Sequence, residues 1–266
     1  MNQFHCCFCT DTRRYIPTQR IHVPLARKCT MGCIYCRYHI DSNITENTIR
    51  PGSARCVVST YTEIFNYLTE KLAEHEKCKI IGVSGPGDPL ENLYSLKILY
   101  DILEQFYPEC TLCICTNGSK FISVQETIVA FSKKLQYLTI TINTLRPNTA
   151  VKLYSSISNI VEAEELFKNQ IYAIDYMKSL GKKVKINTVY IPGINCDEIV
   201  DLYTTLSNHK VDCFNLMPYI DTHGSSPNCP QKYNESKILE VRNQLQERGI
   251  PLACLCKQCR SDYCGY

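Results

Sequence analysis

Six short runs rich in isoleucine, valine, threonine and cysteine alternate with longer helical patterns along this chain. The expected strands are Arg20–Leu25, Lys79–Ser84, Thr111–Thr116, Tyr137–Asn143, Lys183–Ile191 and Cys213–Tyr219. The expected helices are Thr60–His75, Leu93–Tyr107, Val124–Lys134, Ile160–Leu180, Asp197–Asn208 and Asn234–Arg248. Repeated strand–helix units are typical of a parallel sheet with helices packed outside it. Six units are too few to close a barrel of about eight strands, so the sequence predicts an α/β fold with an open, partial barrel.

Local signals mark two of the expected helix ends. Thr60 followed by Glu63 matches a capping box, and Gly181 after Leu180 matches a left-handed C-terminal cap. No linker, repeat or low-complexity tract divides the chain, so we expect one domain over residues 1–266. Its expected parts are an N-terminal extension (1–19), the barrel (20–220), and a C-terminal helix with a cysteine-rich tail (221–266).

The chain carries 18 cysteines in 266 residues, a density usual for short disulfide-bonded secreted proteins. With 44% hydrophobic residues it is long enough to form a core without disulfides. Its first residues do not resemble a signal peptide, and its apolar runs are far shorter than the roughly 20 residues that span a bilayer. We therefore expect a cytoplasmic chain with no membrane partner, whose reduced thiols serve metal or redox chemistry. The net charge of +3, with scattered basic residues, predicts no nucleic-acid partner.

Three cysteines follow the first expected strand in a C-x3-C-x2-C arrangement: Cys29, Cys33 and Cys36. Three thiolates on one short loop suit a 4Fe–4S cluster with one open iron. The alternatives are a structural zinc site completed by a fourth cysteine, or unrelated buried thiols. In folds of this kind the chemistry lies where the strands end, which favours the cluster.

The cysteine triplet at the end of the first strand of a six-unit α/β chain resembles the radical S-adenosylmethionine (SAM) superfamily. The resemblance implies a partial (βα)6 barrel, a 4Fe–4S cluster whose open iron binds SAM, and a strongly reducing partner such as ferredoxin or flavodoxin. From the residues alone, the segments Ser84–Pro89 and Thr116–Gly118 could be plain turns, although two glycines also allow close backbone approach to a ligand. With the resemblance, the residues expected to line the SAM site are Tyr35, Gly85, Gly87, Asp88, Asn117, Thr141, Asn143, Thr188 and Ile191.

Segments spread over nearly the whole chain resemble one family more closely, the nitrogenase cofactor maturases called NifB. They are RIHVPLARKC (20–29), RPG (50–52), GVSGPGDPLEN (82–92), CTNG (115–118), TITIN (139–143), INTVYIPGIN (186–195), FNLMPYI (214–220) and CKQCRSD (256–262). The resemblance implies an enzyme that uses SAM to insert a carbide and to fuse two 4Fe–4S clusters into an eight-iron cofactor precursor. It also implies partner proteins that donate clusters and accept the product.

The same resemblance implies two auxiliary clusters. His22 and Cys113 would bind the first, although a lone histidine on a strand is more often a core residue. Cys256 and Cys259 would bind the second with either Cys7 or Cys9 from the N-terminal extension. The alternative for the C-terminal pair is half of a zinc site.

The sequence departs from the family pattern at two positions. Ser42 stands where the family has a further cysteine, and Thr48 stands where it has a glutamate. Serine is a poor iron ligand beside a thiolate, and threonine cannot transfer protons as a carboxylate does. His39, Asp41 or Cys56 are candidates for the missing ligand, Glu46 for the missing acid, and Glu46 and Arg50 are the candidate catalytic residues. These departures keep two alternatives open: a radical SAM maturase of a peptide or small molecule that uses auxiliary clusters, and a non-catalytic iron–sulfur carrier.

Overall fold

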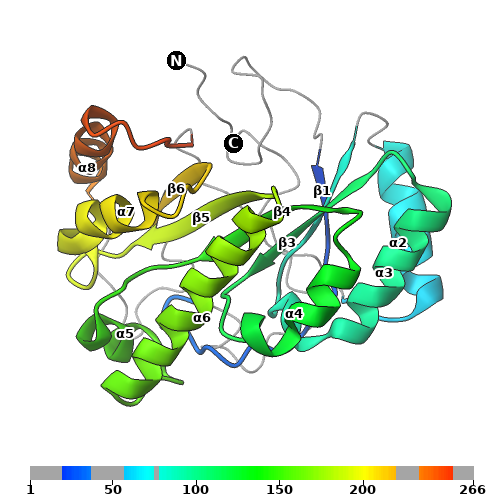
Figure 1. Cartoon of the computed structure of the whole chain (residues 1–266), viewed down its shortest axis with the longest axis horizontal. Helices are drawn as coiled ribbons and strands as arrows, with labels where there is room; N and C mark the ends of the chain where they lie inside the picture. The colour runs from blue at the N-terminus through cyan, green and yellow to red at the C-terminus, as the bar shows by residue number, and fades with distance from the viewer. Residues whose placement is uncertain (1–19, 37–56, 75–77, 220–233, 254–266) are drawn as a thin grey trace.

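The computed structural model describes residues 20–36, 57–74, 78–219 and 234–253. Its centre is a parallel sheet whose strands follow one another in chain order from β1 to β6 (Figure 1). The strands are β1 (Arg20–Val23), β2 (Ile80–Val83), β3 (Thr111–Thr116), β4 (Leu135–Thr141), β5 (Lys183–Tyr190) and β6 (Cys213–Pro218). The described strands form an open sheet flanked by helices, which confirms the predicted partial α/β barrel.

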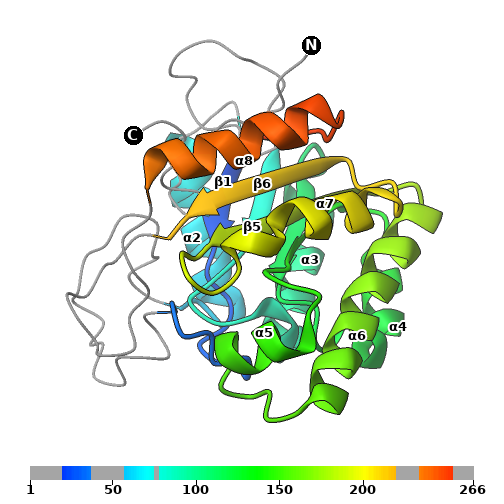
Figure 2. The same cartoon turned by 90° about the vertical axis from the view of Figure 1, so that its left-hand side faces the viewer.

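The expected helices are present with small shifts at their ends (Figures 1 and 2). They are α2 (Tyr61–Glu74), α3 (Leu93–Phe106), α4 (Phe121–Ala130), α6 (Ile160–Ser179), α7 (Ile199–Ser207) and α8 (Glu235–Glu247). The prediction for α4 was wrong at both ends, because the helix begins at Phe121 directly after the turn that follows β3. Three short elements were not predicted: α5 (Pro147–Leu153) and the 3-10 turns η1 (Pro89–Glu91) and η2 (Cys196–Glu198).

Both predicted helix caps are confirmed. The Glu63 amide donates to the Thr60 hydroxyl over 3.3 Å, and the Thr60 amide donates to the Glu63 carboxylate over 3.0 Å. This reciprocal pair satisfies two of the amides that every helix start leaves without intrahelical partners. At the end of α6, Gly181 has a φ of +70°, a conformation that glycine adopts without a steric penalty.

The two faces of the sheet carry different side chains. On β3, Leu112 and Ile114 belong to the main hydrophobic core with residues of α2, α3, α6 and α7, whereas Cys113 is buried but outside that core. Successive side chains of a strand point to opposite faces, so Cys113 faces the interior of the half-barrel. The same interior parity holds for several buried polar residues on neighbouring strands: Arg20, Thr139, Lys185 and Asn215. The half-barrel thus has an apolar outside beneath the helices and a polar inside.

The chain after α8 returns to the sheet. Phe214 on β6 donates its amide to the Pro251 carbonyl over 2.8 Å, and Ala253 donates to the Phe214 carbonyl over 2.7 Å. This short pairing covers the edge of β6, where strands otherwise expose unpaired backbone groups. The predicted extension 1–19 and the cysteines of the C-terminal tail lie outside the described residues.

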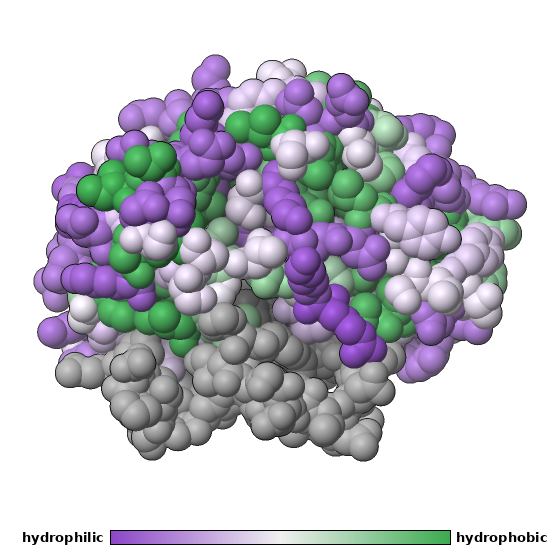
Figure 3. Space-filling model, turned by 90° about the horizontal axis from the view of Figure 1, so that it is seen from below, coloured by the Kyte–Doolittle hydropathy of each residue, from purple (hydrophilic) through white to green (hydrophobic). Residues whose placement is uncertain are grey.

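Seen from the side on which α5 lies in Figure 1, the surface is mixed, with hydrophilic side chains between hydrophobic areas (Figure 3). A search of the described residues finds no helix with the length and apolar character needed to cross a membrane.

Candidate functional site

The loop that carries the cysteine triplet is fixed on one side by the end of α5. The Ile34 amide donates to the Leu153 carbonyl over 3.0 Å, and the Ser155 amide donates to the Gly32 carbonyl over 3.0 Å. Between these bonds Cys33 and Tyr154 form an isolated antiparallel bridge. The helix that the sequence did not predict is therefore the support of the cysteine loop.

On its other side, the chain leading into the cysteine loop lies against the glycine-rich loop that follows β2. The Gly87 amide donates to the Ala26 carbonyl over 2.7 Å, and the Asp88 amide donates to the Lys28 carbonyl over 2.9 Å. A Cβ atom at Gly87 would lie 2.3 Å from the Lys28 carbonyl oxygen, so only glycine fits at this position. Gly85 beside it has a φ of +41°, also a conformation that favours glycine.

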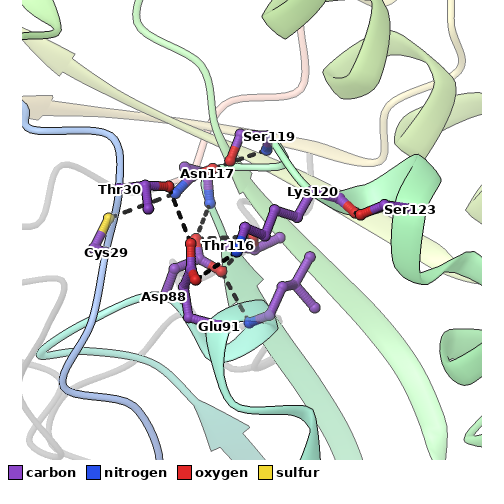
Figure 4. A network of polar contacts seen from close by, with 10 residues as sticks. Cys29, Thr30, Asp88, Glu91, Thr116, Asn117, Ser119, Lys120 and Ser123 are labelled. Atoms are coloured by element: carbon purple, nitrogen blue, oxygen red, sulfur yellow. Dashed lines mark hydrogen bonds and ion pairs between the residues drawn. The ribbon is translucent and has the colours of Figure 1, made fainter. Parts of the chain in front are cut away.

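The Asp88 carboxylate connects this loop to the end of β3 (Figure 4). It accepts from the Thr116 hydroxyl at 2.9 Å, from the Asn117 amide at 2.7 Å and from the Leu90 amide at 3.0 Å. Burial raises the pKa of Asp88, and these donors oppose the rise. The Asn117 side chain in turn donates to the Cys29 sulfur over 3.6 Å. The structure thus brings three predicted site residues, Asp88, Asn117 and Cys29, into one network.

A second carboxylate joins the same loops and was missed from the sequence. Glu91 accepts from the Thr30 hydroxyl at 3.0 Å and from the Lys120 ammonium at 2.6 Å (Figure 4). Its side chain is 5% exposed. Thr30 lies within the cysteine triplet and Lys120 directly before α4, so Glu91 fixes the loop to a third element. A glutamate three residues after Asp88, in the turn after a strand, was the available signal.

Tyr35 and Asn143 meet beneath the cysteine loop. The Asn143 side-chain amide donates to the Tyr35 hydroxyl over 2.6 Å and to the Tyr154 hydroxyl over 3.2 Å. Its side-chain oxygen accepts from the Val189 amide at 2.9 Å, so Asn143 joins the loop to α5 and β5. Burial raises the pKa of Tyr35 well above its usual value, which keeps the phenol protonated.

The remaining predicted SAM-lining residues have different surroundings. Ile191 is buried in the small hydrophobic cluster that contains Met31 of the cysteine loop. Thr141 is half-buried, and its carbonyl accepts from the Gln170 side chain at 3.2 Å. Thr188 lies on the helix-covered face of β5 and donates its hydroxyl to the Ile142 carbonyl over 2.6 Å. The structure does not bring Thr188 to the other predicted residues.

His22 and Cys113, the residues predicted to bind the first auxiliary cluster, lie in one row across the sheet. His22 pairs with Gly82 and Gly82 pairs with Cys113, so the position between them has no side chain. A Cβ atom at Gly82 would lie 2.8 Å from the His22 ring and 2.6 Å from the Arg20 guanidinium. The imidazole and the guanidinium therefore occupy the space above Gly82, inside the half-barrel.

Cys115 follows on the same face and was missed from the sequence. An Arg20 side-chain nitrogen donates to its sulfur over 3.0 Å. The Cys113 thiol and then the Arg20 guanidinium hold the pKa of Cys115 well below its usual value, while burial raises the pKa of Cys113. The available signal was the C-x-C spacing of Cys113 and Cys115, which places both side chains on one face of a strand.

The thiols of the cysteine loop are suited to a cluster. Every cysteine in the described ranges stands outside a disulfide; Cys29 is exposed, and Cys33 and Cys36 are half-buried. Burial raises the pKa of Cys29, and the Asn117 side chain opposes this. Within the described ranges, no three His, Cys, Asp or Glu side chains gather around one ion position.

Several predicted site residues lie outside the described residues. They are Cys7, Cys9, Glu46, Arg50, Cys256 and Cys259, together with the departures from the family pattern at Ser42 and Thr48 and the proposed substitutes His39, Asp41 and Cys56. Their roles stay predictions from the sequence.

The Radical SAM superfamily profile matches residues 23–206, well over half of the chain and including the cysteine triplet, the glycine-rich loop and strands β2 to β5. The chain belongs to the radical SAM superfamily. The predicted superfamily, and with it the prediction of an enzyme, is confirmed. Membership implies a 4Fe–4S cluster and SAM as cofactors. The assignment of Cys29, Cys33 and Cys36 as ligands of that cluster stays a prediction from the sequence.

Within the radical SAM superfamily the chain is similar to FeMo cofactor biosynthesis proteins NifB. It is 29% identical to the protein of Chlorobaculum tepidum over 270 residues, which are 98% of this chain and 61% of that protein. It is 29% identical to the protein of Methanocaldococcus jannaschii over 272 residues, which are 100% of this chain and 87% of that protein. The chain therefore spans less than two thirds of the first relative and most of the second. The predicted resemblance to NifB is confirmed, as a divergent one.

Among solved structures, Streptococcus suis SuiB bound to precursor peptide SuiA is similar in fold, with a TM-score of 0.63. The match has 16% sequence identity and covers 89% of this chain and 48% of that chain. It supports the half-barrel architecture of the radical SAM chain.

Proposed function

We propose that this radical SAM enzyme builds an iron–sulfur cofactor precursor by fusing two 4Fe–4S clusters with insertion of a carbide. The product would be an eight-iron precursor of the nitrogenase cofactor. The observation that carries the proposal is the row formed by His22, Gly82 and Cys113 inside the half-barrel. An imidazole and a thiol are both ligands for iron, and the glycine between them adds no side chain of its own to this face. The similarity to NifB along the whole chain supports the same proposal.

In this proposal the described residues have separate tasks. Cys29, Cys33 and Cys36 would hold the 4Fe–4S cluster, which supplies, when SAM is bound to it, one-electron cleavage of the SAM sulfonium. Asn117 donates a hydrogen bond to the Cys29 sulfur, which partly offsets the rise in the Cys29 pKa that burial causes. Gly87 and the buried Asp88 keep the glycine-rich loop against the cysteine loop.

The interior of the half-barrel is suited to an anionic substrate. Arg20 and Lys185 are each 2% exposed and face the same side of the sheet as Cys113. Iron–sulfur clusters with thiolate ligands carry net negative charge, and buried cations stabilise such groups strongly where water is excluded. The proposal includes a low-potential reductant such as ferredoxin or flavodoxin, cluster donors, and an acceptor protein. It also places the chain in the cytoplasm, because thiolate ligands need a reducing compartment.

The two levels of the proposal are tested in one anaerobic experiment. After reconstitution with iron and sulfide, the full chain is mixed with SAM and dithionite, and 5′-deoxyadenosine and iron per chain are measured. We expect 5′-deoxyadenosine, and iron well above the roughly four atoms of one 4Fe–4S cluster. Cys33→Ala should lower SAM cleavage by more than about 100-fold, since losing even an outer partner of a metal ligand costs about 10–100-fold.

Cys78→Ala is the matched control, because Cys78 is buried in the hydrophobic core. It should keep wild-type cleavage. A reconstituted wild-type chain that binds only about four irons would contradict cofactor assembly and favour a simpler radical SAM reaction. A chain that binds clusters but forms no 5′-deoxyadenosine would contradict both and indicate an iron–sulfur carrier.

A further inference from the structure

Four cysteines in and directly before strands β2 and β3 form two groups by the face on which they lie. Cys78 and Cys110 belong to the main hydrophobic core, packed with leucine and isoleucine side chains. Cys113 and Cys115 are outside that core, although Leu112 and Ile114 between and beside them are part of it. The strand alternation therefore turns the second pair of thiols toward the polar interior. The first pair is explained by packing, since cysteine packs readily as a small hydrophobe, and the second pair is not.

Cys115 lies among groups that suit a bound anion. A nitrogen of the Arg20 guanidinium is 3.0 Å from its sulfur, the distance of a charge-assisted contact. Arg20 also reaches over Gly82, where its nitrogens border the His22 ring. One side chain therefore touches the space above Gly82 and the Cys115 sulfur together. Cys115, Cys113 and His22 surround the same part of the interior.

The three side chains do not converge on one ion position, as noted for the described ranges. A cluster of several irons takes each protein ligand on a separate iron, so side chains from two strands can bind one such group. His22 is on β1, and both thiols are on β3, with the bare Gly82 of β2 between the strands. The ligands would thus reach a cluster from the two strands that flank Gly82, over which the His22 ring and the Arg20 guanidinium lie.

We propose that Cys115 is a third ligand, with His22 and Cys113, of the auxiliary iron–sulfur cluster inside the half-barrel. This inference rests on the proposed function, which places a cluster there. On binding, the Cys115 thiol releases its proton to solvent, and its sulfur forms one bond to an iron by displacing an exchangeable ligand such as water. No electron is transferred in this step. Arg20 offsets the negative charge of the thiolate.

The test compares Cys115→Ser and Cys115→Ala with Cys78→Ser and Cys110→Ser, which alter core thiols. Each full-length chain is reconstituted anaerobically with iron and sulfide. Iron and sulfide per chain are measured, and the dithionite-reduced protein is examined by electron paramagnetic resonance. Far-UV circular dichroism of the metal-free variants checks folding. Cys115→Ser, the nearly isosteric change, carries the test if the alanine variant does not fold.

We expect both Cys115 variants to lose up to about four irons per chain or to change the resonance of the auxiliary cluster, while the core-thiol variants match the wild type. If the wild type holds more than one cluster and the Cys115 variants match it in iron content and spectrum, this inference is overturned and the proposed function stands. If the wild type itself holds only about four irons, the proposed function fails, and the inference fails with it.

Discussion

At residue 87 the backbone of one loop lies directly against the backbone of another. The missing side chain of Gly87 lets the glycine-rich loop touch the Lys28 carbonyl, one residue before the first cysteine of the triplet. The hydrogen bonds from Gly87 and Asp88 to Ala26 and Lys28 depend on this approach. The position of Cys29 is therefore set partly by a residue about sixty positions later in the sequence.

Gly87→Ala should displace the cysteine loop. The added Cβ would lie 2.3 Å from backbone, which cannot rotate away as a side chain can. We expect the free energy of unfolding of the metal-free chain to fall by about 1–3 kcal/mol, the usual range for overpacking. The iron bound after anaerobic reconstitution should fall as well. Denaturant unfolding and iron analysis measure the two effects.

Gly249→Ala serves as the control. Gly249 has a φ of +73° but no atom within 4 Å of an added Cβ, and it follows α8. It should lose about 1 kcal/mol of stability from backbone strain and keep its iron. Equal iron loss in the two variants would show that the contact at Gly87 has no special role.

Some residues of the site could be predicted from the local sequence pattern alone. The cysteine triplet, Gly87 and Asp88 stand out in the sequence because clustered cysteines and a glycine-rich turn with an aspartate directly follow expected strands. Glu91 and Cys115 were missed because their importance comes from partners far away in sequence, Thr30 and Arg20. Thr188 looked like a lining residue from its position near a strand end, but strand parity turns it toward the helices.

At the scale of the single element, α2 shows how much a local signal determines. The residues of its capping box are close in sequence, so the cap could be predicted without knowledge of the fold. The Glu63 carboxylate accepts from the Ser59 amide at 2.9 Å and from the Thr60 amide at 3.0 Å. These bonds lower the pKa of Glu63 from 4.5 to about 2. The ionised carboxylate is therefore favoured in the folded chain over the unfolded one.

Glu63→Gln should make the chain less stable at neutral pH. The contribution of Glu63 is fully present above pH 4.5, where the unfolded group is ionised, and is lost as pH falls toward about 2. The difference in unfolding midpoint between variant and wild type should therefore shrink over that interval. Thermal unfolding of the metal-free chain by circular dichroism, repeated across the interval, measures it. Glu70→Gln, an exposed glutamate beyond the first turn of the same helix, is the control and should lower the unfolding midpoint at neutral pH less than Glu63→Gln does.

The helix α5 could not be predicted by the same reasoning. Its seven residues are too few for a helical pattern to stand out, and helices of this length have little stability of their own. Pro147 near its start fixes one dihedral angle in advance. Most of its stability must come from tertiary contacts, including the pairing of Leu153 and Ser155 with the cysteine loop.

At the scale of the whole molecule, the open sheet leaves β6 as an edge, and residues 251–253 cover it. Arg242 on α8 donates to the Ala253 carbonyl over 2.6 Å and is 7% exposed. The segment is thus attached both to the sheet and to the last described helix. It directly precedes the part of the chain that carries Cys256 and Cys259.

Arg242→Ala should loosen this segment without unfolding the barrel. Hydrogen bonds to charged groups contribute about 1.5–3 kcal/mol, so amide exchange at Ala253 and Phe214 should become about tenfold faster or more. Hydrogen–deuterium exchange with mass spectrometry measures it. The control is Arg248→Ala, which removes an exposed 3.4 Å contact to Thr204 at the end of the same helix. Unchanged exchange in Arg242→Ala would show that the sheet pairing alone holds the segment.

Successive side chains of β3 face opposite sides of the sheet, and the two sides have different roles. Leu112 and Ile114 face the helices and must keep the packing, while Cys113 and Cys115 face the interior and are free of that requirement. During descent from a common ancestor, a few codon changes on the inward side could therefore exchange one chemistry for another without loss of the scaffold. A lineage that had lost a ligand elsewhere in the chain could recruit a new one from this strand, two positions from Cys113.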